Sequence, residues 1–142
     1  KPENILLARE DGAVKVTDFG IAKSRDIKSQ VTISGLIVGS PYFMSPEQGE
    51  GGKMDLRSDI YSLGATFYFS LIGDKPFNGD SPVMIIYKQI HEPLVPPRER
   101  NPSVPESVDR VIVRMMEKNP ERRFASMDEV LAALAEIEKG MP

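Results

Sequence analysis

The chain has 142 residues, of which 40% are hydrophobic and 27% are charged, a composition typical of one folded domain with its own core. Its 18 basic and 21 acidic residues give a net charge of −3, which argues against a dedicated nucleic-acid-binding surface. The absence of Cys excludes disulfides, thiolate metal sites and a thiol nucleophile, and it fits the reducing cytoplasm. The sequence contains no recognisable signal peptide or membrane-spanning segment.

The first part of the chain predicts a β-hairpin. Residues 5–8 and 13–17 are short runs of strand-forming residues, and the turn between them contains Asp11-Gly12. The first run follows Lys1-Pro2-Glu3-Asn4 directly, without an initiator Met, so we expect the chain to be a piece of a larger protein. In residues 18–39 the apolar residues show no sustained helical or strand period, so we expect a loop. A loop of this length is usually functional.

Residues 60–72 predict a central helix. They carry no charge, and their apolar side chains cover every side of a helical wheel, which is typical of a helix buried on all faces. Ser58 is the expected N-cap and Gly73 the expected end. Asp59 lies at the start of this helix, where a buried carboxylate needs hydrogen bonds. We therefore expect Asp59 to bind a piece of backbone that must not move.

Later helices follow the same kind of local signal. Ser81 and Pro82 are expected to start a helix over residues 83–91, after which a Pro-rich segment should cross the surface. Helices over residues 108–117 and 130–139 each have one apolar stripe. The expected capping boxes are Ser103 with Glu106 and Ser126 with Glu129, and the inward stripes are Val108, Val111, Ile112, Met115 and Met116, then Val130, Leu131, Leu134 and Ile137. A hairpin followed by helices places the chain in the α+β class.

Three side chains near the hairpin could bind a metal ion and a phosphate. In Asp18-Phe19-Gly20, the Gly lets the chain turn, so that the preceding carboxylate can reach a metal; alone, the tripeptide more often marks an ordinary strand end. Asn4 lies one hairpin upstream, and hard oxygen ligands suit Mg²⁺. Lys1 could supply a positive charge to a phosphate, although a solvated Lys is the commoner case.

Five motifs occur together in a characteristic order, and together they carry a resemblance. They are Lys1-Pro2-Glu3-Asn4, Asp18-Phe19-Gly20, Ser45-Pro46-Glu47, Asp59-Ile60-Tyr61-Ser62-Leu63-Gly64 and Asn119-Pro120-Glu121-Arg122-Arg123. This pattern resembles the C-terminal lobe of the eukaryotic-like (Hanks-type) Ser/Thr protein kinases, most closely their bacterial receptor-type branch. The resemblance implies a mainly α-helical lobe that starts with a short β-hairpin, with residues 1–142 forming part of a kinase domain and residues 18–47 its activation segment.

The resemblance implies roles for the residues near the hairpin. Asn4 and Asp18 match the Mg²⁺ ligands of the family, with Asp18 bridging the metal to the phosphates of ATP; Mn²⁺ could replace Mg²⁺. Lys1 resembles the catalytic-loop Lys that neutralises the transferring phosphoryl group, and a Lys here is similar to Ser/Thr rather than Tyr kinases. Phe19 and Gly20 complete the metal-binding motif as structural residues.

Other residues match the family's structural positions. Asp59 resembles the carboxylate that binds the catalytic-loop backbone, and Glu47 and Arg123 resemble an ion pair between the end of the activation segment and the late helices. Gly39 and Ser40 resemble the pair that shapes the pocket beside the acceptor residue, with Ser40 touching the catalytic Lys and the base.

Thr32 and Ser34 fall where bacterial receptor-type kinases phosphorylate themselves, so we expect them to be phosphorylated; the alternative is that they are ordinary loop hydroxyls. Ser24 and Ser29 are weaker candidates. A homodimer would allow phosphorylation in trans, and protein substrates are the other implied partners.

The chain departs from the family pattern at Ser40, Phe43, Ser45 and Asn119, none of which would touch metal or phosphate. A larger departure is that the Gly-rich phosphate loop, the ATP-binding Lys and the base Asp are not found, and they would precede Lys1. We therefore expect the chain alone to be inactive, as a fragment of a cytoplasmic or membrane-anchored Ser/Thr kinase. The alternative is a pseudokinase or scaffold that keeps the fold; a helical domain unrelated to kinases fits the motifs poorly.

Overall fold

The computed structural model describes residues 1–9, 12–17 and 40–140. A 3₁₀ turn, η1 (Pro2–Asn4), leads into an antiparallel pair of strands, β1 (Ile5–Leu7) and β2 (Val14–Val16). Ile5 lies opposite Val16 in this pair, and the turn ends at Gly12, whose φ of +70° favours glycine. The predicted hairpin is confirmed.

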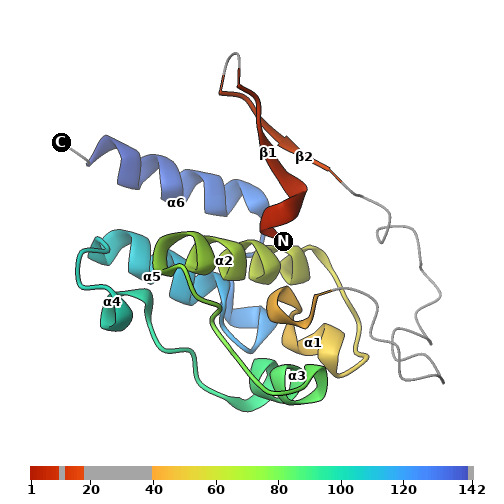
Figure 1. Ribbon diagram of the computed structural model, residues 1–142. Coiled ribbons are helices and arrows are strands. Elements are labelled where there is room, and N and C mark those ends of the chain that lie inside the picture. The colour runs from red at the N-terminus through yellow and green to blue at the C-terminus, as the bar shows by residue number, and fades with distance from the viewer. Residues whose placement is uncertain (10–11, 18–39, 141–142) are drawn as a thin grey trace.

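Helices make up the rest of the described chain. They are η3 (Pro41–Phe43), α1 (Pro46–Gly49), α2 (Leu56–Ile72), α3 (Pro82–His91), α4 (Pro97–Arg100), α5 (Glu106–Met115), η4 (Pro120–Arg122) and α6 (Met127–Lys139). In Figure 1, α2 crosses the middle, with α1 and α3 below it and α6 and the hairpin above it. The α+β prediction, a helical lobe with a hairpin at its start, is confirmed. Within the described residues, no helix is long and apolar enough to span a membrane.

The central helix begins three residues earlier than the sequence predicts, at Leu56. Asp55 is its N-cap, because the Asp55 carboxylate accepts a hydrogen bond of 2.8 Å from the Arg57 N–H. Ser58 lies inside the first turn and uses its hydroxyl in a tertiary contact, so the predicted N-cap is wrong. The predicted end is confirmed: Gly73 has a φ of +78°, and its N–H donates to the Phe69 carbonyl.

The two halves of the core meet at α2. One cluster of buried side chains comprises Phe43, Tyr61, Ala65, Tyr68, Phe77, Ile112 and Met116, and the other comprises Ile60, Val111, Met115, Phe124 and Val130. The helix is nevertheless not buried on every face, since Leu56 and Leu71 are exposed. Burial on all faces is therefore a wrong prediction for the described part of the chain.

Of the caps predicted for the next two helices, the one at Ser81 forms and the one at Ser103 does not. Ser81 caps α3 through the Met84 N–H, as predicted. Ser103 does not cap α5: the helix starts after Pro105 without a side-chain cap, and Ser103 lies in a preceding turn in which its N–H donates to the Asn101 side chain.

The last helix, α6, is capped by the predicted residue, but the predicted capping box is not complete. The Ser126 hydroxyl accepts the Glu129 N–H, as predicted, whereas the Glu129 carboxylate accepts the N–H of Ala125 instead of Ser126. Val130 is buried, but Leu131, which was expected to face inward, is 58% exposed.

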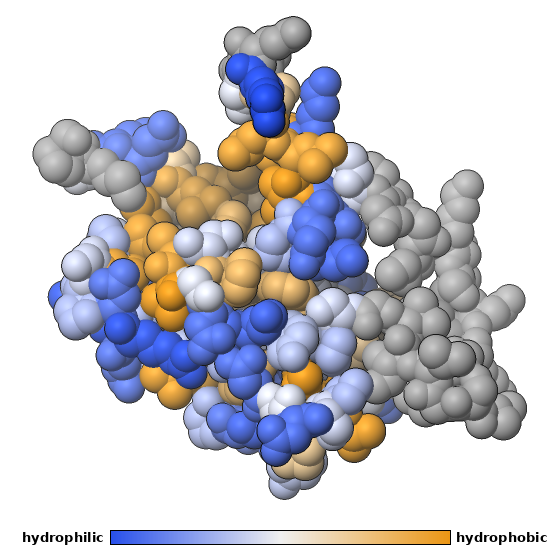
Figure 2. All heavy atoms as spheres, in the orientation of Figure 1, coloured by the Kyte–Doolittle hydropathy of each residue, from blue (hydrophilic) through white to orange (hydrophobic). Residues whose placement is uncertain are grey.

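Both strands of the hairpin carry exposed hydrophobic side chains. Figure 2 shows hydrophobic residues gathered on the hairpin and in the hollow between it and α6. The exposed side chains on the strands are Leu6, Leu7, Val14 and Val16.

Gly64 allows α2 to pack closely against the end of α5. A Cβ at this position would lie 2.8 Å from the Met115 Cβ and 2.9 Å from the Met116 Cγ. Glycine is therefore required here by contact between helices rather than by backbone conformation, since Gly64 lies in the middle of α2.

We expect Gly64→Ala to lower the free energy of unfolding by about 1–3 kcal/mol, because the added methyl group must separate the two helices. Urea unfolding of the variant beside the wild-type protein measures this change. The matched control is Ser70→Ala on the exposed side of the same helix, which should stay within about 0.5 kcal/mol. A Gly64→Ala variant as stable as the control would contradict the close packing.

Candidate functional site

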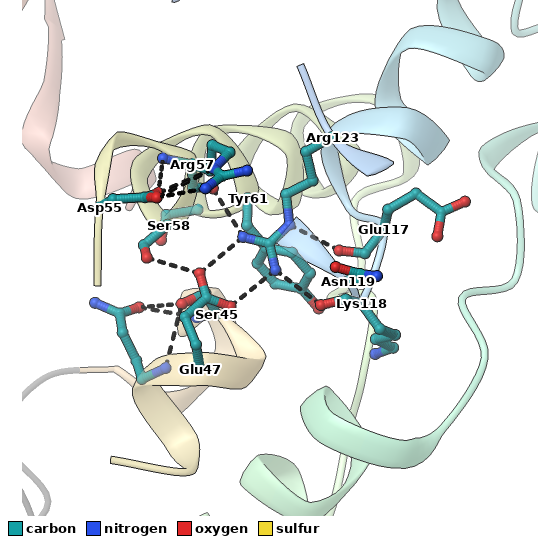
Figure 3. Close-up of polar contacts among 12 residues, drawn as sticks. Ser45, Glu47, Asp55, Arg57, Ser58, Tyr61, Glu117, Lys118, Asn119 and Arg123 are labelled. Atoms are coloured by element: carbon teal, nitrogen blue, oxygen red, sulfur yellow. Dashed lines mark hydrogen bonds and ion pairs between the residues drawn. The ribbon is translucent and has the colours of Figure 1, made fainter. Parts of the chain in front are cut away.

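A buried ion pair joins two parts of the chain that lie 76 positions apart. Both terminal nitrogens of Arg123 donate to Glu47, with 2.8 Å from Nη1 to Oε1 and 2.8 Å from Nη2 to Oε2. The Arg123 side chain is completely buried and the Glu47 side chain is 11% exposed. Figure 3 shows the carboxylate of Glu47 facing the guanidinium. This bidentate geometry gives both charges strong hydrogen bonds.

The remaining donors of Arg123 bind main-chain carbonyls. Nε donates to Glu117 at 2.7 Å, Nη1 to Arg57 at 2.8 Å, and Nη2 to Lys118 at 3.0 Å. The guanidinium also lies 4.9 Å from the centre of the Tyr61 ring. Arg123 therefore connects α1, the start of α2 and the segment before η4.

The carboxylate of Glu47 is satisfied from two sides. Besides Arg123, the Ser58 hydroxyl donates to its Oε1 at 2.6 Å. Burial by itself would raise the pKa of Glu47, but hydrogen bonds from Arg123 and Ser58 outweigh it and hold the pKa below its ordinary value of 4.5. Glu47 is thus ionised near neutral pH, as the pair requires.

Residues 40–47 lead into α1, and other parts of the described chain bind their backbone closely. The Ser62 hydroxyl donates to the Phe43 carbonyl at 2.7 Å. Ser45 forms a capping box with Gln48, in which the Ser45 N–H donates to the Gln48 side chain at 2.9 Å. Sequence reasoning missed this box, although Ser45 and Gln48 have the required spacing. Ser40 is half-buried, and its side chain makes no capping bond to η3.

Asn4 lies beside the residue that precedes Asp18. The Thr17 N–H donates to the Asn4 carbonyl at 2.8 Å, which extends the hairpin pairing by one residue. Lys1 is exposed, and its carbonyl accepts the Asn4 N–H at 2.9 Å. The other predicted site residues in this region, Asp18, Phe19, Gly20, Thr32, Ser34 and Gly39, lie outside the described residues, as do Ser24 and Ser29.

Asp59 does not have the environment that the sequence predicts. The residue is exposed, and it makes no hydrogen bond or ion pair with another described residue. Partial burial of the carboxyl group raises its pKa. The expectation that Asp59 is buried is therefore wrong for the described chain, because the first turn of α2 buries Ser58 and Ile60 and points the intervening residue outward. Its expected bond to the catalytic-loop backbone stays a prediction.

Asn119 occupies the position where the family pattern has Asp. Its side-chain oxygen accepts the Glu121 N–H at 2.9 Å and caps η4. This bond needs an acceptor but no charge, so Asn can replace Asp here without loss of the cap.

Lys118 is a half-buried amine whose environment no sequence motif predicts. Its Nζ donates to the carbonyls of Gln89 at 2.6 Å and Lys88 at 3.3 Å, near the end of α3, and lies 4.0 Å from the centre of the Phe77 ring. Burial lowers the pKa of Lys118 to about 8; the nearby Arg123 adds to this effect and Glu92 opposes it.

Comparison with known proteins gives consistent matches. A family model described as "Protein kinase domain" matches residues 1–134. A probable serine/threonine-protein kinase of Clostridium perfringens is 45% identical over 139 residues, covering 98% of this chain and 20% of the relative. The serine/threonine-protein kinase PknB of Mycobacterium leprae is 39% identical over 142 residues, and that of Mycobacterium tuberculosis is 40% identical over 143 residues; each match covers 100% of this chain and 23% of the relative. The chain thus spans about a fifth of the length of the curated relatives it matches.

We expect Glu47→Gln to lower the free energy of unfolding by about 3–5 kcal/mol, because Arg123 would keep its buried charge without a counter-ion. Urea unfolding measures the loss. The wild-type protein should lose the contribution of the pair as pH falls through the lowered pKa of Glu47, whereas the variant should lack this acid-dependent part. Glu136→Gln, which removes a charge from an exposed pair with Lys139, is the control and should cost about 0.5 kcal/mol or less. Equal losses in the two variants would contradict the role of burial.

We expect Lys118 to make stability depend on pH on the alkaline side. Its pKa is about 8 in the folded protein against an ordinary 10.5, so the unfolded chain binds more protons between these values and the free energy of unfolding gains a contribution that rises with pH. The stability of wild type minus that of Lys118→Met should therefore increase from pH 8 to pH 10.5. Denaturation at several pH values tests this, with Lys139→Met as the exposed control. A difference that falls with pH would contradict the lowered pKa.

Proposed function

Because this chain belongs to the protein kinase family, we propose that the full-length protein transfers the γ-phosphoryl group of ATP to Ser or Thr hydroxyls of protein substrates. The observation that carries the proposal is the position of Asn4, which the bond from Thr17 holds beside the strand end that leads to Asp18. A side-chain amide and a carboxylate would then lie close together, next to Lys1 in the chain. This donor set suits a metal-bound nucleotide.

The proposed roles follow from the chemistry of these side chains. Asn4 and Asp18 would hold Mg²⁺, or Mn²⁺ in its place, through hard oxygen atoms. When bound, the metal ion supplies positive charge against the phosphates of ATP. Lys1 is exposed, and its ammonium group would bind the transferring phosphoryl group as a point charge.

The acceptor side of the proposed site lies at the start of residues 40–47. Gly39 and Ser40 would form the pocket beside the acceptor hydroxyl. The backbone that follows them is bound by Ser62, and the far end of this segment is bound through Glu47 and Arg123. A segment bound at several points supports the proposal, because transfer requires the acceptor to be positioned closely.

Regulation is proposed to act through Thr32 and Ser34. Phosphorylation adds nearly two negative charges and can order a loop against a cation. A second copy of the kinase would supply the phosphate in trans, which makes a transient homodimer the proposed partner beside protein substrates. The proposed place of action is the cytoplasm, either free or at the cytosolic face of a membrane, and the Cys-free sequence fits this reducing compartment.

We expect the full-length protein to incorporate phosphate from labelled ATP and Mg²⁺, and Asp18→Asn to lower the rate by about a hundredfold or more, since it removes the negative charge that would hold the metal ion against the phosphates. Mass spectrometry should place the label on Thr32 or Ser34. Asp80→Asn, an equal change at an exposed position, is the control and should retain the rate. Negligible label in every protein would overturn catalysis and favour a pseudokinase scaffold.

A further inference from the structure

Gln89 connects α3 to the backbone that follows Ser40. Its side chain is completely buried, and its amide nitrogen donates to the carbonyls of Pro41 at 3.2 Å and Tyr42 at 2.8 Å. Its amide oxygen accepts a hydrogen bond of 2.6 Å from the Tyr61 hydroxyl of α2. One side chain thus joins three elements: α3, η3 and α2.

The chemistry of these partners determines which way the amide faces. Main-chain carbonyls only accept hydrogen bonds, so the NH₂ end of Gln89 must face Pro41 and Tyr42. The oxygen end then needs a donor, which is the Tyr61 hydroxyl. Burial raises the pKa of Tyr61 far above its ordinary value of 10, so this hydroxyl keeps its proton at physiological pH. A carboxylate at position 89 would have no donor for either carbonyl.

The main chain of Gln89 is held as well. The Lys118 ammonium donates to the Gln89 carbonyl at 2.6 Å, close to the end of α3. The amide is therefore carried by a helix turn that is itself bound to the segment before η4. A side chain in such a position can hold another backbone with little freedom to move.

We propose that Gln89 is a positioning residue for the phosphoryl acceptor, because it holds the Pro41–Tyr42 backbone directly after Ser40. The inference rests on the proposed function, which places Gly39 and Ser40 beside the acceptor hydroxyl. In this proposal Gln89 holds the start of the segment at Pro41 and Tyr42, and the ion pair of Glu47 with Arg123 holds its other end.

A positioning role and a general structural role predict effects on different kinetic constants. Gln89 contacts the acceptor side of the segment, whereas the residues proposed to bind metal and phosphate, Lys1, Asn4 and Asp18, belong to the hairpin and the strand end. Loss of the amide should therefore change binding of the protein or peptide substrate and leave binding of ATP unchanged.

The test uses the full-length protein with Gln89→Met, which keeps the length of the side chain and removes its hydrogen bonds. We expect the KM for a peptide substrate to rise about tenfold, with the KM for ATP unchanged and kcat within about threefold. Hydrogen exchange at Phe43 and Met44, whose N–H groups donate to Ser40 and Pro41, should become faster. Lys88→Met on the same helix, which removes an outer ion pair with Glu92, is the control and should change neither.

A second variant, Gln89→Glu, gives a readout that a purely structural role would not change. The introduced acid can donate to one carbonyl only when it is protonated, and burial raises the pKa of such a group. Its KM for peptide should fall towards the wild-type value as pH is lowered from about 7.5 to about 6, a range in which Lys118 is mainly charged. This variant also serves if Gln89→Met does not fold.

Two results would overturn the proposal. One is a wild-type peptide KM and wild-type exchange rates in Gln89→Met; the other is a loss shared equally by all kinetic constants, with no pH-dependent recovery in Gln89→Glu. If the wild-type protein transfers no phosphate, the proposed function fails and the acceptor role of Gln89 fails with it. The exchange rates at Phe43 and Met44 then decide separately whether Gln89 holds the segment.

Discussion

The rest of the described structure depends on one buried charge, the guanidinium of Arg123. A buried cation is unfavourable unless all its donors are bound, and here each of its three nitrogens has at least one acceptor within 3.0 Å. These acceptors come from α1, the first turn of α2 and the segment before η4, so the hydrogen-bonding requirement of one side chain determines how three regions meet. Glu47 supplies the opposite charge, and Ser58 binds the remaining side of that carboxylate.

Tyr61 links this charged centre to the hydrogen bonds on the acceptor side. Its ring lies against the Arg123 guanidinium, and its hydroxyl donates to Gln89. Both ends of the segment between Pro41 and Glu47 are therefore connected to the same buried side chain of α2, the helix that contributes to both halves of the core. A segment bound at both ends has little freedom to move, which agrees with its proposed role in positioning an acceptor hydroxyl.

Sequence predictions are accurate for features that depend on neighbouring residues and fail for features that depend on tertiary contacts. The hairpin turn, the cap at Ser81 and the glycine that ends α2 depend on neighbouring residues alone, and all three are confirmed. Ser58 and Ser103 have the correct type for a cap, but the Ser58 hydroxyl binds Glu47 inside the fold, and Ser103 lies in a turn two residues before the actual N-cap, Pro105. Leu131 follows the helical period, yet its burial depends on whether another element covers α6, and no helical wheel contains that information.

By itself, the sequence determined the family, because the order and spacing of five motifs survive in the printed residues and the comparisons confirm it. It also indicated that Glu47 and Arg123 would meet, although only through the family resemblance, since no local rule joins positions 76 residues apart. Only the tertiary structure decided that Gln89 is buried, and Lys118 half-buried, where α3 meets η3 and the segment before η4. Their sequence context is that of an amphipathic helix end and a charged turn, and only when the chain folds do distant main-chain carbonyls come within hydrogen-bonding distance of them.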